Sequence, residues 1–182
     1  MKLISLLEKL EYTCLQGSTD QEVKNVIYDS RKVEEGSLFI CIRGAVVDGH
    51  KFVPDVVAKG AKVLIVEEAV EAPEDVTVIL VKDTRYAMAF ISAAYFGYPA
   101  EKLKTIGITG TKGKTTTTYM VKSILENAGY KVGLIGTIEA IIGDKVIPAK
   151  NTTPESYVIQ EYSMRWQKPA VTVWLWKFPP KD

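Results

Sequence analysis

The residues from Thr105 to Thr118 have the types and spacing of a loop that binds phosphate groups. An apolar stretch ends at Thr109, and a glycine-containing turn then leads into Lys114 and a run of threonines. Glycine lets the backbone direct its N–H groups inward, and a helix that begins at such a loop adds the positive end of its dipole. These residues therefore predict that the chain binds a nucleotide through its phosphates.

The residues of this loop have separate predicted roles. Lys114 is expected to reach the terminal phosphates as the catalytic lysine, and the hydroxyl of Thr115 lies where such loops hold Mg²⁺. The predicted ATP-binding residues are Gly110, Thr111, Lys112, Gly113, Lys114, Thr115 and Thr116. Ile108 departs from the Walker A pattern, because it stands where the first glycine is expected. A glycine- and threonine-rich loop before an ordinary helix is the alternative interpretation.

Strands and helices are predicted to alternate before this loop, which is typical of an α/β protein. The strands are expected at residues 23–28, 38–42, 62–66 and 76–81. The helices are expected at residues 3–10, 52–57 and 84–96. Gly97 and Pro99 end the last of these helices, so the first domain is predicted to span residues 1–98.

The second unit carries the loop itself. It is predicted to begin with a strand, a helix and a strand, at residues 104–109, 114–128 and 131–136. This order implies a right-handed crossover with the phosphate at the carboxyl end of the first strand. The pair Gly143-Asp144 then predicts a hairpin, and a further helix is expected to begin near Pro154.

Composition and charge limit the classes of function. The 182 residues are 47% hydrophobic and 25% charged, as in soluble globular proteins, and carry a net charge of +1. A charge so close to zero does not indicate binding to nucleic acid, and no apolar run is long enough to span a membrane. The N-terminus also lacks a signal-peptide pattern. We expect a cytoplasmic monomer that binds neither nucleic acid nor membranes.

The cysteines and the histidine do not predict a reactive site. Cys14 and Cys41 have neither metal-ligand nor redox spacing, and we expect both to be buried, reduced thiols. His50 is the only histidine. It follows Asp48 and Gly49, and a turn position suits it better than a catalytic role.

Three groups of residues resemble the motifs of one protein family. Tyr28-Asp29-Ser30-Arg31 and Asp48-Gly49-His50 are similar to its uridine-nucleotide-binding N-terminal domain. Residues 109–116 are similar to its phosphate loop, which also lacks the first Walker glycine. The segment that contacts the UDP-sugar-peptide resembles Gly133-Leu134-Ile135-Gly136-Thr137 and Asn151-Thr152-Thr153-Pro154-Glu155. The family is that of the ATP-dependent muramyl ligases of peptidoglycan synthesis, and the resemblance covers the chain up to residue 162.

The resemblance implies a ligase that adds the third amino acid to UDP-N-acetylmuramoyl-L-alanyl-D-glutamate through an acyl phosphate, with ATP and Mg²⁺ as cofactors. The amino acid is lysine or meso-diaminopimelate. The Thr152-Thr153-Pro154 element favours this branch over the neighbouring ligase that adds D-Ala-D-Ala. The implied substrate-binding residues are Tyr28, Ser30, Asn151, Thr152 and Thr153. On the residues alone, Ser30 also suits a cap beside an Asp29–Arg31 pair, and residues 151–153 also suit turn and cap positions.

Two other functions stay open at this point. The first domain alone would make a nucleotide-binding module without catalysis. Another P-loop NTPase, such as a folate polyglutamate ligase or a regulatory ATPase, would also carry the phosphate loop. The Asp29-Ser30-Arg31 motif counts against this last class, because it has no role in such proteins.

The tail from residue 163 differs from the rest of the chain. All 3 tryptophans lie in it, at Trp166, Trp174 and Trp176. A divergent apolar tail with a strand near residues 171–176 is one interpretation. We favour a slipped reading frame, in which each original codon joins the third base of one present codon to the first two bases of the next. The codon across Trp176 and Lys177 must then encode Glu, and the codons before it permit an apolar strand. A Glu in that place resembles the next motif of the ligases, where it helps to hold Mg²⁺.

We therefore expect a first domain at 1–98, an incomplete ATP-binding domain at 99–162 with a parallel sheet, and an aberrant tail at 163–182. The chain would then lack that Glu, a later modified lysine and a third domain of the family. We therefore expect it to lack ligase activity. The sheet around the loop would be unfinished, which would expose apolar surface on the helix at 115–128.

Overall fold

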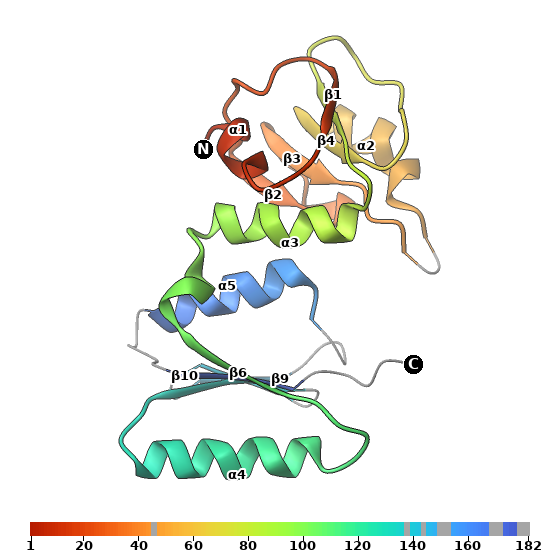
Figure 1. Cartoon of the computed structure of the whole chain (residues 1–182). Coiled ribbons are helices and arrows are strands. Elements are labelled where there is room, and N and C mark those ends of the chain that lie inside the picture. The colour runs from red at the N-terminus through yellow and green to blue at the C-terminus, as the bar shows by residue number, and fades with distance from the viewer. Residues whose placement is uncertain (45–46, 137–138, 143–144, 149–153, 168–172, 178–182) are drawn as a thin grey trace. The chain divides into compact units, whose positions relative to one another are not determined.

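The computed structural model describes residues 1–44, 47–136, 139–142, 145–148, 154–167 and 173–177. The chain divides into two compact units, Met1–Tyr95 and Phe96–Asp182 (Figure 1). Each unit contains a five-stranded sheet with helices, so the α/β class predicted from the sequence is confirmed. The division falls between Tyr95 and Phe96, and the first domain predicted from the sequence ends at residue 98.

The first unit is built on a mostly parallel sheet with the strand order β1-β5-β4-β3-β2. Its strands are β1 (Thr13–Gln16), β2 (Asn25–Ile27), β3 (Ser37–Ile40), β4 (Val63–Val66) and β5 (Thr77–Leu80). Its helices are α1 (Leu3–Leu7), α2 (Val53–Ala58) and α3 (Thr84–Tyr95). Strands β2 to β5 run parallel, whereas β1 pairs antiparallel with β5. The predicted strands and helices of this unit are thus present, with ends that differ by a few residues.

The core of the first unit uses both faces of this sheet. Phe39 of β3 and Leu64 of β4 pack in one cluster with Val56 of α2. Their neighbours Leu38 and Ile65 are also fully buried, and alternation along a strand turns them to the opposite face. Burial of both faces explains why these strands appear in the sequence as continuous apolar runs.

Strand β1 is not predicted from the sequence. Its residues are exposed except for Gln16, which is half-buried, so no apolar alternation marks the strand. The side-chain amide of Gln16 donates to the carbonyls of Pro73 and Val76 at 2.6 and 2.8 Å, which fixes this edge of the sheet. The strand also corrects the expectation for Cys14, which is exposed, whereas Cys41 is buried as predicted. Burial raises the pKa of the Cys41 thiol to about 12.

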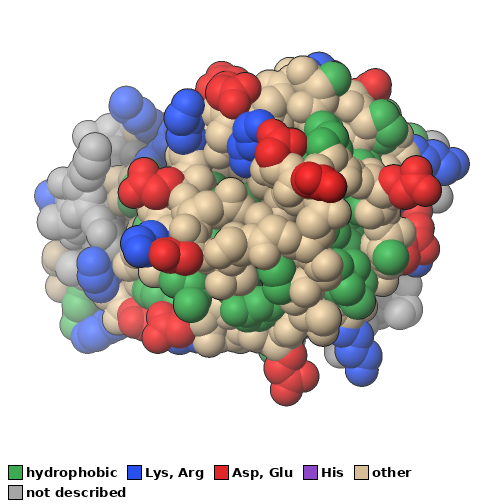
Figure 2. All heavy atoms as spheres, turned by 90° about the horizontal axis from the view of Figure 1, so that it is seen from above, with side chains coloured by type: hydrophobic (Ala, Val, Ile, Leu, Met, Phe, Trp, Pro, Cys, Tyr) green, Lys and Arg blue, Asp and Glu red, His purple; other side chains and the backbone are tan. Residues whose placement is uncertain are grey.

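The surface of the first unit mixes charges of both signs. Lys2 pairs with Asp20 and Lys62 with Asp75, each at 2.6 Å. Figure 2 shows basic and acidic side chains interspersed over the face that it presents, in agreement with the net charge of +1. In the part of the chain that the structure describes, no helix is long and apolar enough to cross a membrane.

The second unit is built on a sheet with the strand order β6-β10-β7-β8-β9. Its strands are β6 (Lys104–Ile108), β7 (Val132–Ile135), β8 (Glu139–Ile142), β9 (Lys145–Pro148) and β10 (Val173–Lys177). Its helices are α4 (Lys114–Asn127) and α5 (Ser156–Gln167), which lie on opposite faces of the sheet (Figure 1). The strands of the predicted hairpin are the antiparallel pair β8 and β9, and its turn residues Gly143 and Asp144 lie outside the described residues.

Strand β10 lies inside this sheet, between β6 and β7 and parallel to both. The tail therefore contributes an interior strand, whereas the sequence predicts an unfinished sheet and an aberrant tail. The strand fits there because its successive side chains point to opposite faces of the sheet. Trp174 packs with Ile159 of α5 in an apolar cluster, and alternation turns Leu175, between the two tryptophans, towards α4. Both faces of β10 thus find helices to pack against.

Helix α4 nevertheless carries the exposed apolar surface that the sequence predicts. Met120 is 60% exposed and Ile124 is 65% exposed. On the neighbouring edge strand β6, Ile106 is 38% exposed. Apolar groups thus remain in contact with water on this side of the second unit.

Candidate nucleotide-binding site

The predicted phosphate loop joins the end of β6 to the start of α4. Strand β6 ends at Ile108, and α4 begins at Lys114 with Gly113 as its N-cap. Gly113 has a φ of 75°, in the left-handed region that residues with a Cβ atom seldom adopt. Glycine is therefore needed here to turn the chain from the loop into the helix. The first N–H groups of α4 face this turn, so an anion can bind at them.

The loop residues are accessible from solvent. Gly110 to Gly113 and Thr116 are exposed, and Lys114 and Thr115 are half-buried. The Lys114 ammonium donates to the carbonyl oxygen of Gly110 and, at 3.4 Å, to that of Thr111. Its charge thus lies over the loop, next to the backbone that is predicted to hold phosphate. The structure brings together all the residues predicted to bind ATP.

A second ammonium group lies at the same loop. Nζ of Lys177, the last residue of β10, donates to Oγ1 of Thr115 at 2.8 Å. Burial, and then the charge of Lys114, lower the pKa of Lys177. Sequence reasoning does not identify Lys177, because the tail is set aside there as aberrant. The position of Lys177 at the end of an apolar strand is the feature of the sequence that could have indicated it.

The residues around Thr115 do not fit the predicted Mg²⁺ ion. Mg²⁺ binds oxygen ligands at about 2 Å, but the Thr115 oxygen already accepts a hydrogen bond from an ammonium group. Two like unit charges 4 Å apart near a protein surface repel by about 4 kcal/mol, and a dication doubles that repulsion. Lys177 thus occupies the place where the ion is expected.

A small pocket lies beside Thr115. Among the described residues it is lined by Thr115, Thr118, Tyr119, Leu134, Gly136, Glu139 and Lys177. The Tyr119 hydroxyl donates to Oε1 of Glu139 at 2.5 Å. This hydrogen bond, together with burial, raises the pKa of Tyr119 to about 12. The only carboxylate that lines the described pocket is therefore already engaged by a phenol.

In the first unit, Ser30 lies in a turn that is fixed by its neighbours. Asp29 accepts a hydrogen bond from the backbone N–H of Arg31 at 3.1 Å, and the Arg31 guanidinium binds the same carboxylate at 2.9 and 2.8 Å. The hydrogen bond from the Arg31 side chain lowers the pKa of Asp29 to about 2. Nζ of Lys59 donates to the carbonyl oxygen of Ser30 at 2.8 Å. The Asp29–Arg31 pair considered in the sequence analysis is thus present.

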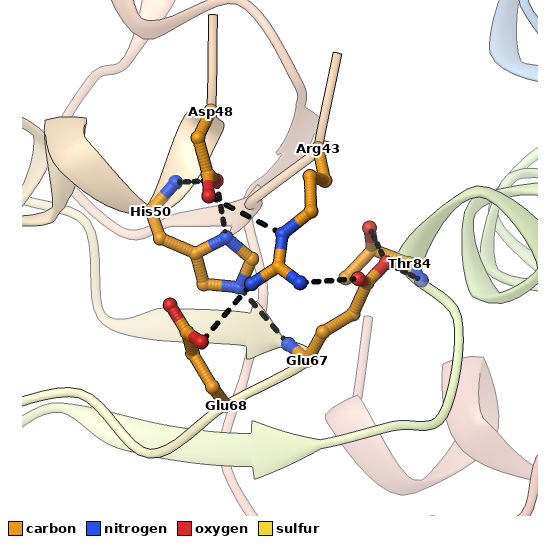
Figure 3. A network of polar contacts seen from close by, with 6 residues as sticks. All are labelled: Arg43, Asp48, His50, Glu67, Glu68 and Thr84. Atoms are coloured by element: carbon orange, nitrogen blue, oxygen red, sulfur yellow. Dashed lines mark hydrogen bonds and ion pairs between the residues drawn. The ribbon is translucent and has the colours of Figure 1, made fainter. Parts of the chain in front are cut away.

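His50 belongs to a polar network that supports the first unit (Figure 3). Its Nδ1 lies 2.6 Å from Oδ1 of Asp48, and its Nε2 accepts a hydrogen bond from the backbone N–H of Glu67 at 3.0 Å. The Glu67 carboxylate in turn accepts from the N–H and the hydroxyl of Thr84 at 2.8 and 2.7 Å. The network links the end of β4 to the start of α3. His50 is buried there in a structural turn, as the sequence predicts.

Three residues of this region have the types that bind metal ions, but their ligand atoms already have other partners. Possible ligand atoms of Asp48, His50 and Glu68 lie within 4.8 Å of one another. However, both ring nitrogens of His50 are hydrogen-bonded, and Arg43 pairs with Asp48 at 3.2 Å and with Glu68 at 3.0 Å. The Arg43 guanidinium supplies the positive charge that these carboxylates need (Figure 3).

The remaining predicted residues divide between the two units. Tyr28 is half-buried and directly follows β2. The segment Gly133–Gly136 lies in and just after β7, and Pro154 and Glu155 lead into α5. Asn151, Thr152, Thr153 and Thr137 lie outside the described residues.

Two family models match the chain. The model described as "Mur ligase family, catalytic domain" matches residues 22–96, and the model described as "Mur ligase middle domain" matches residues 108–175. The first match contains Tyr28, Ser30 and the His50 network. The second contains the phosphate loop and extends into the tail that the sequence analysis sets apart.

Curated relatives extend the comparison. The chain is 53% identical over 161 residues to the UDP-N-acetylmuramoyl-L-alanyl-D-glutamate–2,6-diaminopimelate ligase of Clostridium perfringens, covering 88% of this chain and 33% of that protein. It is 44% identical over 160 residues to the ligase of the same name from Geobacillus kaustophilus, covering 88% of this chain and 32% of that protein. The chain thus spans about a third of the length of the curated relatives it matches.

Solved structures share the fold. A UDP-N-acetylmuramoyl-L-alanyl-D-glutamate–2,6-diaminopimelate ligase superimposes with a TM-score of 0.77 at 20% identity, covering 98% of this chain and 36% of that one. MurF from Acinetobacter baumannii superimposes with a TM-score of 0.61 at 26% identity, covering 97% of this chain and 35% of that one.

Proposed function

Because the chain belongs to the Mur ligase family, we propose that it carries the UDP-substrate-binding and ATP-binding parts of a ligase that joins 2,6-diaminopimelate to UDP-N-acetylmuramoyl-L-alanyl-D-glutamate. The observation that carries the proposal is the phosphate loop, with Lys114 and the start of α4 at the carboxyl end of β6. The names of the relatives support diaminopimelate over lysine as the added amino acid.

The loop suits the first chemical step of such a ligase. A carboxylate is a poor acyl donor, so the γ-phosphoryl group of ATP is transferred to it, ADP leaves, and an acyl phosphate forms. The amine then attacks the acyl carbon, the amide bond forms, and inorganic phosphate leaves. The transfer brings several negative charges together. The Lys114 ammonium and the backbone N–H groups of residues 113–116 are the groups that would offset them.

The first unit would hold the UDP end of the substrate. Ser30 is proposed to donate a hydrogen bond to the uridine nucleotide, with Tyr28 beside it on the chain. Two contacts support this role, because the Asp29–Arg31 pair and Lys59 fix the turn in which Ser30 lies. Asn151, Thr152 and Thr153 are proposed, from the resemblance alone, to bind the sugar-peptide part.

Two alternatives remain as outcomes of the test. The fold is also that of MurF from Acinetobacter baumannii, which keeps the ligase that adds D-Ala-D-Ala as a second candidate. A module that binds ATP and the uridine nucleotide without catalysis is the third candidate. The expectations that this chain lacks turnover and that its tail follows a slipped reading frame stay predictions.

The test compares two proteins in one assay of phosphate release from ATP. One is the 182-residue chain, and the other is made from the same gene with one base inserted near the codon of Tyr162 to shift the reading frame. We expect release by the second protein only with UDP-N-acetylmuramoyl-L-alanyl-D-glutamate and diaminopimelate, and none by the first. Release that requires D-Ala-D-Ala would identify the neighbouring ligase. Turnover by the 182-residue chain would refute the prediction that it is inactive. A gene sequence that encodes the same tail without a change of reading frame would refute the frameshift.

A further inference from the structure

The contact between Lys177 and Thr115 is not explained by the proposed function. In a P-loop, the hydroxyl that follows the lysine is the protein's ligand to the divalent cation. Here the Oγ1 atom of that hydroxyl accepts a hydrogen bond from an ammonium group at 2.8 Å. A positive charge is therefore already present at the position that the metal ion takes in such loops.

The sheet holds Lys177 in this position. In the parallel register of β10, Lys177 lies opposite Ile108, the last residue of β6 before the phosphate loop. The strand is fixed on its other side by β7, where Trp176 lies opposite Ile135. Alternation turns Trp176 to the α5 face and Lys177 to the α4 face. Because α4 begins at the loop, its face of the sheet is the one on which Thr115 lies.

The charges around the loop favour a polyphosphate without a metal ion. Lys114 is part of such a loop whether or not a metal ion binds, and Lys177 adds one further positive charge at Thr115. Glu139, the carboxylate that lines the described pocket, accepts a hydrogen bond from Tyr119. A divalent cation at Thr115 would thus have to displace an ammonium group and would gain no free carboxylate ligand from this pocket.

We propose that Lys177 is the built-in cation of this phosphate loop, so that the loop binds a nucleoside triphosphate without Mg²⁺. The ammonium group replaces the ion at Thr115 and neutralises the phosphate oxygens that the ion would otherwise bind. This inference rests on the assignment of ATP to the loop in the proposed function. It concerns the binding of the nucleotide alone and requires no turnover.

The test is calorimetric titration of the 182-residue chain with ATP, in EDTA and in excess Mg²⁺. We expect the dissociation constant to agree within about twofold between the two buffers, because Lys177 supplies the charge in both. Lys177→Gln should weaken binding in EDTA by about tenfold or more, the usual effect of losing a charged hydrogen bond. Lys177→Arg should preserve binding in EDTA. Lys177→Glu should make binding depend on Mg²⁺, since a carboxylate then faces Thr115.

Lys104→Gln is the matched control, because it removes one positive charge from the opposite end of β6. It should leave binding in EDTA unchanged, and circular dichroism should show that all variants are folded. Binding of ATP by the unmodified chain only with Mg²⁺ would overturn the Lys177 proposal and leave the ligase proposal intact. No binding in either buffer would contradict both. Binding in EDTA that survives Lys177→Gln would also overturn the role of Lys177.

Discussion

The backbone N–H of Glu67 donates a hydrogen bond to Nε2 of His50 at 3.0 Å. Because Nε2 is the acceptor, the proton of the ring lies on Nδ1 and points to Asp48, 2.6 Å away. One buried ring thus ties the loop that precedes α2 to the end of β4. The stability of the first unit should depend on both of its partners.

Asp48 should make the first unit sensitive to acid. Hydrogen bonds from the backbone N–H and then the ring of His50 lower the pKa of Asp48 from 3.8 to about 2. A lowered folded-state pKa stabilises the fold above the unfolded value, and this contribution is lost as pH falls through the folded value. Urea unfolding should show a loss of about 1–2 kcal/mol between about pH 4 and pH 2. Asp48→Asn should flatten this dependence, whereas Glu74→Gln, at an exposed position, should leave it unchanged.

Glu67 should stabilise the start of α3. Its carboxylate accepts hydrogen bonds from the N–H and the hydroxyl of Thr84, the first residue of the helix. Glu67→Ala should lower the free energy of unfolding by about 1–2 kcal/mol, as the loss of a helix cap does. Glu68→Ala removes a neighbouring carboxylate that is 59% exposed and should cost less than about 0.5 kcal/mol. Equal effects in thermal or urea unfolding would contradict the capping role.

Lys114 should be needed to bind ATP and not to fold. It is half-buried at the start of α4, and its ammonium contacts only backbone carbonyls of the loop among the contacts described above. Lys114→Ala should weaken ATP binding by about 10- to 100-fold, with an unchanged unfolding midpoint. Lys122→Ala removes an ammonium that pairs with Glu126 farther along α4 and should change the affinity by less than about twofold. Titration of both variants with ATP gives the comparison.

Trp174 should be essential to the second unit. It is 3% exposed in the interior strand β10 and packs with Ile135 of β7 and Ile159 of α5. Trp174→Ala should destabilise this unit by about 3–5 kcal/mol, because it leaves a cavity between sheet and helix. Val146→Ala, at a position that is 57% exposed on β9, should cost less than about 0.5 kcal/mol. Amide hydrogen exchange in β6 and β7 measures the difference. If these amides stay protected in Trp174→Ala, the position of β10 between the two strands is contradicted.

The two cysteines should differ in reactivity. Cys14 is exposed on the edge strand β1, whereas burial raises the pKa of Cys41 to about 12. Because the thiolate is the reactive form, a maleimide at neutral pH should label Cys14 and leave Cys41 unlabelled in the folded chain. Mass spectrometry after digestion identifies the labelled residue, and Cys14→Ser should abolish labelling.

The sequence predicts well what depends on local pattern. Apolar runs locate β3, β4 and β5, and Gly113 followed by Lys114 locates the phosphate loop and the start of α4. Strand β1 escapes, because its exposed residues show no alternation and its position depends on pairing with β5. The place of β10 between β6 and β7 escapes as well, because strand order is decided by tertiary packing. For this reason the contact of Lys177 with Thr115 follows only from the structure.

The tryptophans of β10 have a practical consequence. All 3 tryptophans of the chain, Trp166, Trp174 and Trp176, belong to the second unit. The rings of Trp174 and Trp176 are stacked, with centroids 5.9 Å apart. Excitation of indole fluorescence therefore reports on the second unit alone, and the insertion of β10 into its sheet should shift the emission. Since Lys177 is the next residue after Trp176, the same signal gives an optical readout of nucleotide binding at the loop, free of any contribution from the first unit.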